Sequence, residues 1–432
     1  MVLTFKLVVS LALLVLLLVS KRFDLGRLRS RQFTLLSWSA LASIRFIVFC
    51  MIYVVLNLNP QSDMIGYFSE AKDALNGGLI YRDFESSYGP IFTYMDAVVV
   101  YLWHSPKSII LFAIVLELAS FPLWLCVARG CFDEGTVRTA ALLYILSPIP
   151  FFATGVSGLN QSLGAAYLAL VILLLMSRRE GLAGFVMGMA IPGVKFLMVL
   201  FSPIAWVFSR HKTRFLVGFC IPVIAVYGTI HLLGADLTVP FKIQVNDQTS
   251  GNLPFLLGLV GLDAASPGVS RLFDCMTAIA LALVFLIHAI RTRTEQASWV
   301  VHMCSIIGLT FMLFSKKSYT TYLVLFYFPL CISVAKSGFS LASAAQFGVF
   351  NLVATLEPSL LFRWVLNSST IKNPSLAYLS MIHRNSVFIS VIFLVVNLAL
   401  VSSYCRLLIG IWRVMLQDRS ERERAVPEVQ FA

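Results

Sequence analysis

Apolar runs long enough to cross a bilayer recur along the 432-residue chain. Each run of about 18 or more apolar residues predicts a membrane-spanning helix. The composition agrees, because 59% of the residues are hydrophobic and 12% are charged, whereas a soluble domain carries roughly 25% charge. These features exclude a soluble globular fold, a disordered chain, a coiled coil and a disulfide scaffold, and the runs lack the alternation of barrel strands. We predict an all-α polytopic membrane protein.

The formal net charge of +12 at pH 7 is explained by membrane topology. Lys and Arg gather in short clusters between the apolar runs, where the positive-inside rule places them, so no nucleic-acid partner is indicated. The eight cysteines have neither paired spacing nor a neighbouring His cluster. We therefore expect free thiols, with neither a disulfide framework nor a metal site.

A basic cluster at residues 21–31 sets the predicted topology. It holds five Lys and Arg residues between two apolar runs, so it is expected in the cytoplasm. The polar segment 59–88 then lies outside, as does a second polar segment at 235–253. We predict one transmembrane domain over residues 1–412, followed by a charged cytoplasmic tail at 413–432.

The middle of the chain leaves the number of spans open. Residues 181–209 form an apolar stretch that is too long for one straight span and too short for two, and Pro192-Gly193 interrupts it. A broken helix is expected there. Residues 88–104 either cross the membrane or lie partly in the interface, so two topologies remain between 88 and 209. The prediction is a bundle of about 11 to 13 transmembrane helices.

Three lysines stand where membrane rules do not expect them. Lys316 and Lys317 fall in a loop predicted to lie outside, against the positive-inside rule. They form either a tolerated two-charge loop or a site for an anionic ligand. Lys195 follows the break in the 181–209 stretch, and it either reaches the interface with its amine or binds a ligand in a polar cavity.

The segment 59–88 is the most informative part of the chain. Its first half predicts a helix with one amphipathic face, closed by the stop signal Asn76-Gly77-Gly78. The residues of that face are Ile65, Phe68, Ala71, Lys72 and Leu75. A helix lying on the outer membrane surface would hold Asp63 at its N-terminal end. Asp63 is then either a carboxylate at the mouth of a membrane cavity or a plain helix N-cap.

A series of short motifs runs from this segment to about residue 325. Asp63 follows an early span, Tyr67 comes four residues later, the amphipathic helix closes in a Gly pair, and Tyr81-x-Asp-Phe and Tyr88-Gly-Pro open the next apolar run. Gly158-Leu-Asn-Gln-Ser-Leu, the small-residue stretch before Lys195, and Ser315-Lys-Lys with Tyr319 and Tyr322 follow. In this order the motifs resemble the GT-C superfamily of integral-membrane glycosyltransferases. The likeness is closest to the polyprenyl-phosphate-sugar enzymes of glycosyltransferase family 87 and to GPI mannosyltransferase I.

The resemblance implies an inverting glycosyltransferase with a GT-C-like helical bundle. It would move a sugar, mannose or another hexose or pentose, from a polyprenyl-phosphate-linked donor to an acceptor hydroxyl on a glycan, glycolipid or protein. The expected location is the bacterial plasma (inner) membrane, with the active site on the external, periplasmic side. Neither a cofactor nor a metal is implied. Asp63 would be the general base that removes the hydroxyl proton.

The resemblance also suggests which residues contact the substrates. Lys316 and Lys317 are the first candidates for the donor phosphate, and Lys195 and Arg82 are the second. The other expected substrate contacts are Tyr67, Glu70, Tyr81, Asp83, Tyr88, Asn160, Gln161, Tyr319 and Tyr322. Many relatives carry a second acid where this chain has Asn160-Gln161, and these amides cannot act as acid or base.

Two other functions fit the sequence. The break at Pro192-Gly193 with Lys195 beside it is typical of a transporter or flippase, here for a lipid-linked sugar. A polymerase or ligase of surface polysaccharide would share the helical composition and the external acids.

Overall fold

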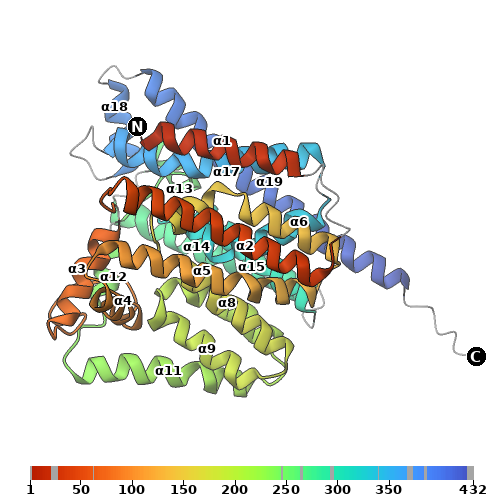
Figure 1. Cartoon of the computed structure of the whole chain (residues 1–432), viewed down its shortest axis with the longest axis horizontal. Coiled ribbons are helices and arrows are strands. Elements are labelled where there is room, and N and C mark those ends of the chain that lie inside the picture. Colours follow the sequence, from red (N-terminus) through yellow and green to blue (C-terminus); the bar gives the residue numbers. More distant parts are fainter. Residues whose placement is uncertain are drawn as a thin grey trace, which may run out of the picture.

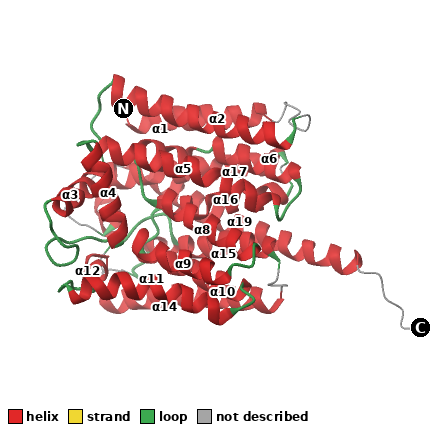
Figure 2. Cartoon of the chain, turned by 60° about the horizontal axis from the view of Figure 1, so that its bottom comes forward, coloured by secondary structure: helices red, strands yellow, loops and turns green. Residues whose placement is uncertain are grey.

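The chain folds into a bundle of helices that run mostly along one direction, with the C-terminal helix projecting from one end (Figures 1 and 2). The structure is a computed structural model of the full chain. It describes residues 2–20, 28–61, 63–244, 247–262, 266–291, 296–338, 340–366, 373–383 and 387–425. Within these ranges the regular elements are helices, and an isolated β-bridge joins Ile80 and Phe84.

Long helices form the body of the bundle, shorter or broken helices lie among them, and short helices cover the loops. The long ones are α1 (Val2–Ser20), α2 (Ser30–Phe49) with its π-helical continuation η2 (Cys50–Val55), α5 (Pro106–Arg129), α11 (Lys212–Leu232), α14 (Pro267–Arg291), α15 (Ala297–Phe314), α17 (Leu341–Leu360) and α19 (Val387–Ala425). The shorter or broken ones are α6 (Glu134–Ile145), α7 (Pro148–Pro150), η3 (Phe151–Val156), α8 (Gln161–Met176), α9 (Glu180–Gly193), η4 (Phe196–Phe201), α10 (Ser202–Phe208), η5 (Thr320–Phe326) and α16 (Tyr327–Lys336). The remaining ones are α3 (Asp63–Leu75), α4 (Pro90–Leu102), α12 (Val239–Gln244), α13 (Leu253–Leu259), η6 (Leu361–Leu366) and α18 (Pro374–His383).

Length and hydropathy separate the predicted spans into two kinds. Among the described residues, six helices are long and apolar enough to cross a membrane, and the bent pair of α6 with α7 and η3 can act as a seventh. Five further apolar helices have only 10–17 residues. Several apolar runs of the sequence therefore form helices that are shorter than a full bilayer crossing, or that are broken by Pro and Gly.

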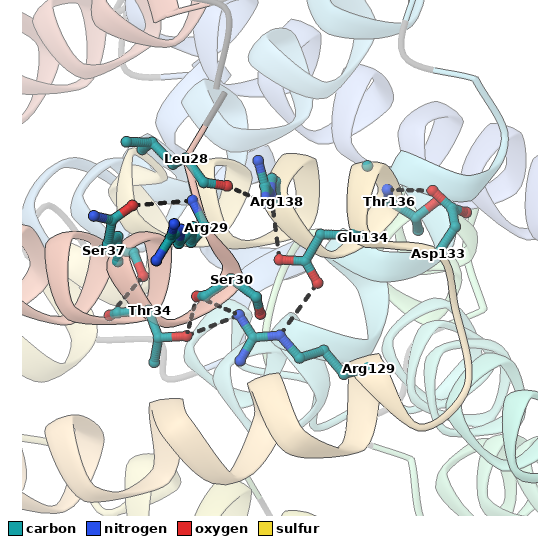
Figure 3. Close-up of polar contacts among 12 residues, drawn as sticks. Leu28, Arg29, Ser30, Thr34, Ser37, Arg129, Asp133, Glu134, Thr136 and Arg138 are labelled. Atoms are coloured by element: carbon teal, nitrogen blue, oxygen red, sulfur yellow. Dashed lines mark hydrogen bonds and ion pairs between the residues drawn. The ribbon is translucent and has the colours of Figure 1, made fainter. Parts of the chain in front are cut away.

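A polar network joins the N-terminal end of α2 to the C-terminal end of α5 (Figure 3). The Arg129 guanidinium donates to the Ser30 carbonyl at 3.2 Å and to the Thr34 hydroxyl at 2.8 Å. Glu134 pairs with Arg129 at 3.3 Å and with Arg138 at 3.2 Å. We call this end of the bundle the Arg129 end.

The opposite end carries α3, α4 and α12 (Figure 1), and we call it the α3 end. Here the Lys107 ammonium, in the first turn of α5, donates to the Tyr53 carbonyl at 2.8 Å and to the Asn57 side chain at 2.6 Å. The chain from 57 to 106 therefore leaves and re-enters the bundle at the same end. This resolves the alternative at residues 88–104, because α4 lies at the end of the bundle beside α3 and adds no crossing.

The predicted break in the 181–209 stretch is confirmed. Helix α9 ends at Gly193, and the chain continues as the 3₁₀ segment η4 and then α10. Val194 and Lys195 between α9 and η4 have non-helical backbone angles. At the other terminus α19 continues to Ala425, so no helix boundary marks the proposed start of a tail at residue 413.

An ion pair inside the bundle holds α2 against α5. Arg45 binds Glu117 with two hydrogen bonds of 2.8 and 2.9 Å, and both side chains are fully buried. The Tyr144 hydroxyl adds a third bond to the Glu117 carboxylate at 3.0 Å. Because loss of either partner would leave an uncompensated buried charge, this contact holds the two helices in one relative position.

Candidate active site

Helix α3 places Asp63 at its N-terminal end, as the sequence predicts, and Gly77 after its last turn has φ +86°. The face that packs on the protein differs from the predicted one. Met64, Tyr67 and Ala71 are buried, whereas Ile65 is 65% exposed. The predicted amphipathic face is therefore only partly correct, since Ala71 belongs to the packed side and Ile65 forms an apolar edge away from it.

The Asp63 carboxylate is exposed and receives a hydrogen bond from the Tyr88 hydroxyl at 3.2 Å. The ring of Tyr88 packs against two other rings. The Tyr67 ring meets it edge-on with centroids 4.7 Å apart, and the centroid of the Phe92 ring lies 5.8 Å away. Gly89 permits the close approach of this turn to α9, because a Cβ there would lie 2.3 Å from the Pro192 carbonyl oxygen. The turn thus joins α3 to the break after α9.

Lys195 projects from that break toward Asp63. Its ammonium donates to the Tyr322 hydroxyl at 3.0 Å and lies 5.0 Å from the ring centre of Tyr88 and 5.1 Å from that of Tyr322. The carboxylates of Asp63 and Asp247 are close enough to act on its charge. The lysine is therefore held over two aromatic faces, as cation–π contacts require.

Lys317 adds a second ammonium group to the same place. It donates to the Asp247 carboxylate at 2.6 Å, and its side chain is 14% exposed. The charges of Lys195 and Asp63 also act on it. Burial, reinforced by the charge of Lys195, lowers the pKa of Lys317 to about 8. A desolvated ammonium beside a second one is a place where an anion is favourable.

A buried polar network supports the segment that carries Lys317. The Thr249 amide donates to the Lys316 carbonyl at 2.9 Å, and the Ser318 amide donates to the Thr249 hydroxyl at 3.0 Å. The Asn252 side chain donates to the Ser318 hydroxyl at 3.1 Å and caps α13 by accepting from the Phe255 amide. These bonds tie residues 247–252 to residues 315–318 and so fix the pair of Asp247 and Lys317.

Three of the predicted contacts lie elsewhere. Lys316 points to the other side of its segment, where it pairs with Asp274 at 2.8 Å and donates to Ser270. Arg82 pairs with Asp83 at 2.8 Å and donates to the Leu233 carbonyl at 3.0 Å. Arg82 and Asp83 are both exposed in the loop after α3, and Arg82 reaches the turn that follows α11. The structure does not bring these three side chains to Asp63.

Glu70 lies on α3 and contacts the loop between α3 and α4. Its carboxylate accepts from the Ser86 hydroxyl at 2.7 Å and from the Thr93 hydroxyl at 3.3 Å. Burial raises the pKa of Glu70 to about 7, although these two bonds oppose the rise. Tyr81 is also buried and donates to the Tyr88 carbonyl. Glu70 and Tyr81 therefore brace the loop that positions Tyr88.

The remaining predicted contacts are Tyr319, Asn160 and Gln161. Tyr319 lies beside Tyr322, with ring centroids 5.6 Å apart. Asn160 and Gln161 are buried at the start of α8. The contact that sequence reasoning missed is Asp247, which pairs with Lys317 across 70 residues. Its place in a polar segment was visible, but no local pattern indicated its partner.

The site therefore combines one exposed carboxylate with two ammonium groups and three tyrosines at the α3 end of the bundle. The members are Asp63, Tyr88, Lys195, Lys317, Tyr319 and Tyr322. Among the described residues, no three His, Cys, Asp or Glu side chains are grouped as metal ligands would be. Chemically, the arrangement can accept a proton at Asp63 and hold an anion at the lysines.

Comparison with known proteins shows the fold. No protein-family model matches the chain, and no curated protein matches its sequence. The structure is similar to that of ArnT from Cupriavidus metallidurans bound to undecaprenyl phosphate, with a TM-score of 0.51 and 14% sequence identity. The match covers 90% of this chain and 77% of the other. It confirms the predicted all-α helical fold, which this chain shares with ArnT.

Proposed function

We propose that the chain is an inverting glycosyltransferase that uses a polyprenyl-phosphate-linked sugar. The observation that carries the proposal is the meeting of Asp63 with Lys195 and Lys317 at one end of a membrane bundle. The similar ArnT structure has undecaprenyl phosphate bound, which supports a lipid phosphate as the group that the lysines hold.

The reaction is a single displacement at the anomeric carbon. The Asp63 carboxylate takes the proton of the acceptor hydroxyl as its oxygen bonds to the anomeric carbon, and the bond from that carbon to the phosphate oxygen breaks. The electron pair stays on the polyprenyl phosphate, whose added negative charge Lys317 and Lys195 stabilise. A phosphate leaving group needs no proton at neutral pH, so one carboxylate suffices, and the amides at 160 and 161 are compatible with this scheme.

The proposal extends to the setting of the reaction. The donor sugar is mannose or another hexose or pentose, and the acceptor is a glycan, glycolipid or protein. The protein acts in the bacterial plasma membrane, with Asp63 on the external face. The positive-inside rule supports this orientation, since Arg129 and Arg138 lie at the opposite end from Asp63.

Transfer by the purified protein tests the proposal. Protein in detergent is given undecaprenyl-phosphoryl mannose and other undecaprenyl-phosphoryl sugars, with a membrane lipid and glycan extract as acceptor source. Sugar transfer without a membrane separates an enzyme from a flippase, which would only move the lipid between leaflets.

Substitution of Asp63 tests the base. Asp63→Asn is expected to lower kcat by about 10²- to 10⁴-fold, because general-base catalysis contributes a factor of that size. Asp73→Asn is the matched control, since Asp73 is an exposed carboxylate further along the same helix. Retention of more than about a tenth of the activity in Asp63→Asn would contradict the proposed role.

A further inference from the structure

The N-terminus of α8 lies among the elements that carry the base and the lysines. Gly158 contacts α3, because a Cβ there would lie 3.0 Å from the sulfur of Met64. One turn into α8, Gly164 packs against Leu325 of η5 and against Val194. Met64 and Val194 adjoin Asp63 and Lys195 in the sequence, and Leu325 follows Tyr322 by three residues in η5. The start of α8 therefore packs against the elements that carry the carboxylate and the Lys195 ammonium.

Two amide side chains in this turn have unused hydrogen-bonding groups. The Asn160 Nδ2 donor and the Gln161 Oε1 acceptor are buried and have no hydrogen-bond partner among the described residues. The side chains are 3% and 5% exposed. Native proteins pair nearly all their buried polar atoms, so a donor and an acceptor left open side by side indicate a ligand.

The conformation of Asn160 supports this interpretation. Asn at the first position of a helix normally bonds its side chain to the helix backbone. Asn160 occupies that position in α8 and makes no such bond. Ser162, two residues later, behaves differently, since its hydroxyl donates to the Ala113 carbonyl of α5 at 3.3 Å. The amide of Asn160 therefore makes no capping bond to its own helix.

The unused groups discriminate between ligands. A phosphate oxygen could accept from Asn160, but an ionised phosphate has no proton to donate to Gln161. A sugar hydroxyl can do both, because it carries one donor and two acceptor lone pairs. Both amides are uncharged, so they match a neutral ring.

We propose that Asn160 and Gln161 bind the hydroxyl groups of a neutral sugar between Asp63 and the two lysines. This inference rests on the proposed function and names its substrate class, a sugar without an ionised group at the recognised positions. The sugar belongs either to the donor or to the acceptor, and the experiment separates these two sources.

Binding to the purified, full-length protein tests the inference in two arms. The donor arm compares the Kd of undecaprenyl phosphate with that of undecaprenyl-phosphoryl mannose, and the ratio isolates the sugar. The acceptor arm measures the Kd of methyl α-mannoside in the presence of undecaprenyl phosphate. Asn160→Ala and Gln161→Ala are each expected to weaken sugar binding about 3- to 10-fold in one arm, the effect of one lost hydrogen bond.

Matched variants separate binding from folding. Ser162→Ala removes a hydroxyl from the same turn that points to α5 and is expected to leave both arms unchanged. If the alanine variants do not fold, Asn160→Asp keeps the shape and removes the donor, and Gln161→Met keeps the length and removes the acceptor. The same loss of sugar binding is expected from them.

Each outcome decides between the possibilities. A loss confined to the donor ratio identifies the donor sugar, and a loss confined to methyl α-mannoside identifies the acceptor. Equal affinities of the wild type and the variants in both arms would overturn the inference, including the case in which neither sugar binds. So would an equal weakening for undecaprenyl phosphate itself, which indicates a structural role. Failure of the proposed function has a different signature, because undecaprenyl phosphate would then bind independently of Lys317.

Discussion

Lys316 and Lys317 are neighbours in the sequence with different roles in the structure. The segment after α15 is irregular, so consecutive side chains point to different sides. Lys317 turns inward to Asp247 and the Asp63 group, whereas Lys316 turns to the exposed Asp274 on α14. Sequence reasoning assigned the phosphate to both lysines, and the structure favours Lys317.

Exchange of either lysine separates these roles. Lys317→Ala is expected to raise the KM for an undecaprenyl-phosphoryl sugar about 10- to 100-fold, because it removes a charge-assisted bond worth roughly 1.5–3 kcal/mol. Lys316→Ala is expected to change it less than about twofold, since the Lys316 ammonium pairs with Asp274 and Ser270, away from the Asp63 group. Steady-state kinetics of the two variants measures this. An equal rise of the KM in both variants would mean that Lys316 and Lys317 both bind the donor phosphate.

The lowered pKa of Lys317 predicts a pH limit for donor binding. Burial and the charge of Lys195 bring this pKa to about 8, so the ammonium is charged below pH 8 and neutral above it. The affinity for undecaprenyl phosphate is expected to fall as pH rises through about 8. Lys317→Arg, which stays charged, should move this fall to higher pH. Titrating Kd between pH 6.5 and 10 checks it, and coincident profiles for the two proteins would contradict it.

The raised pKa of Glu70 makes the free energy of unfolding depend on pH. Burial brings the pKa of Glu70 to about 7 in the folded protein, against an ordinary value of 4.5. Between these values the folded state binds the proton and the unfolded state does not, so ∂ΔG/∂pH of unfolding is negative. As pH rises from 4.5 to 7, loss of the Glu70 proton therefore lowers the free energy of unfolding by about 2 kcal/mol. Glu70→Gln should make this dependence on pH weaker. Thermal unfolding in detergent across this range measures it, with Glu85→Gln, at an exposed carboxylate, as a control that keeps the wild-type slope.

At the scale of elements, glycines bring α9 and α11 together. A Cβ at Gly184 would lie 2.0 Å from the Phe215 carbonyl oxygen, and one at Gly188 would lie 2.2 Å from that of Phe219. From the other helix, a Cβ at Gly218 would lie 2.1 Å from the Gly181 carbonyl oxygen. Small residues at four-residue spacing let membrane helices approach to backbone contact. Because α9 ends one residue before Val194, this contact also supports the break that holds Lys195.

Substitution at this contact is expected to loosen the bundle. Gly184→Val should destabilise the protein by about 1–3 kcal/mol through overpacking against backbone that cannot shift cheaply, and the apparent Tm in detergent should fall. Gly228→Ala on α11 is the control, because nothing lies within 4 Å of a Cβ there. An unchanged Tm in Gly184→Val would mean that α9 and α11 are not packed in this way.

The elements also show how far sequence reasoning reaches. The predicted break at Pro192-Gly193 is the end of α9, and the predicted stop at Asn76-Gly77-Gly78 ends α3. Hydrophobic length and local breakers determine such features, and both are written in consecutive residues. The packed face of α3 was not predictable in this way, because an apolar side chain such as Ile65 is stable either against protein or against lipid.

The sequence likewise indicates one residue of the candidate site and not the contacts between its residues. Asp63 stands out locally as a carboxylate between a span and an amphipathic helix. The pairing of Asp247 with Lys317, and the bond from Lys195 to Tyr322, join residues 70 and 127 positions apart. Such contacts depend on how whole helices pack, and a single sequence carries no signal for them.

At the scale of the whole molecule, the two ends of the bundle differ in charge and in chemistry. The Arg129 end gathers Arg129 and Arg138 around Glu134 (Figure 3), and the exposed turn after α8 adds Arg178 and Arg179. The α3 end holds the carboxylate of Asp63 with its two lysines. Positive charge retains loops in the cytoplasm during insertion, so this asymmetry supports the proposed orientation with Asp63 outside.

The orientation of the protein in the membrane can be measured directly by adding one cysteine at a time and labelling it in right-side-out membrane vesicles. Ser69→Cys lies on exposed α3, and Ser177→Cys lies at the exposed C-terminal end of α8. A membrane-impermeant maleimide is expected to label position 69 in intact vesicles and position 177 only after permeabilisation. The wild type, with its eight native cysteines, supplies the background at each step. The reverse pattern would place Asp63 in the cytoplasm, where a base for transfer on the external face could not act.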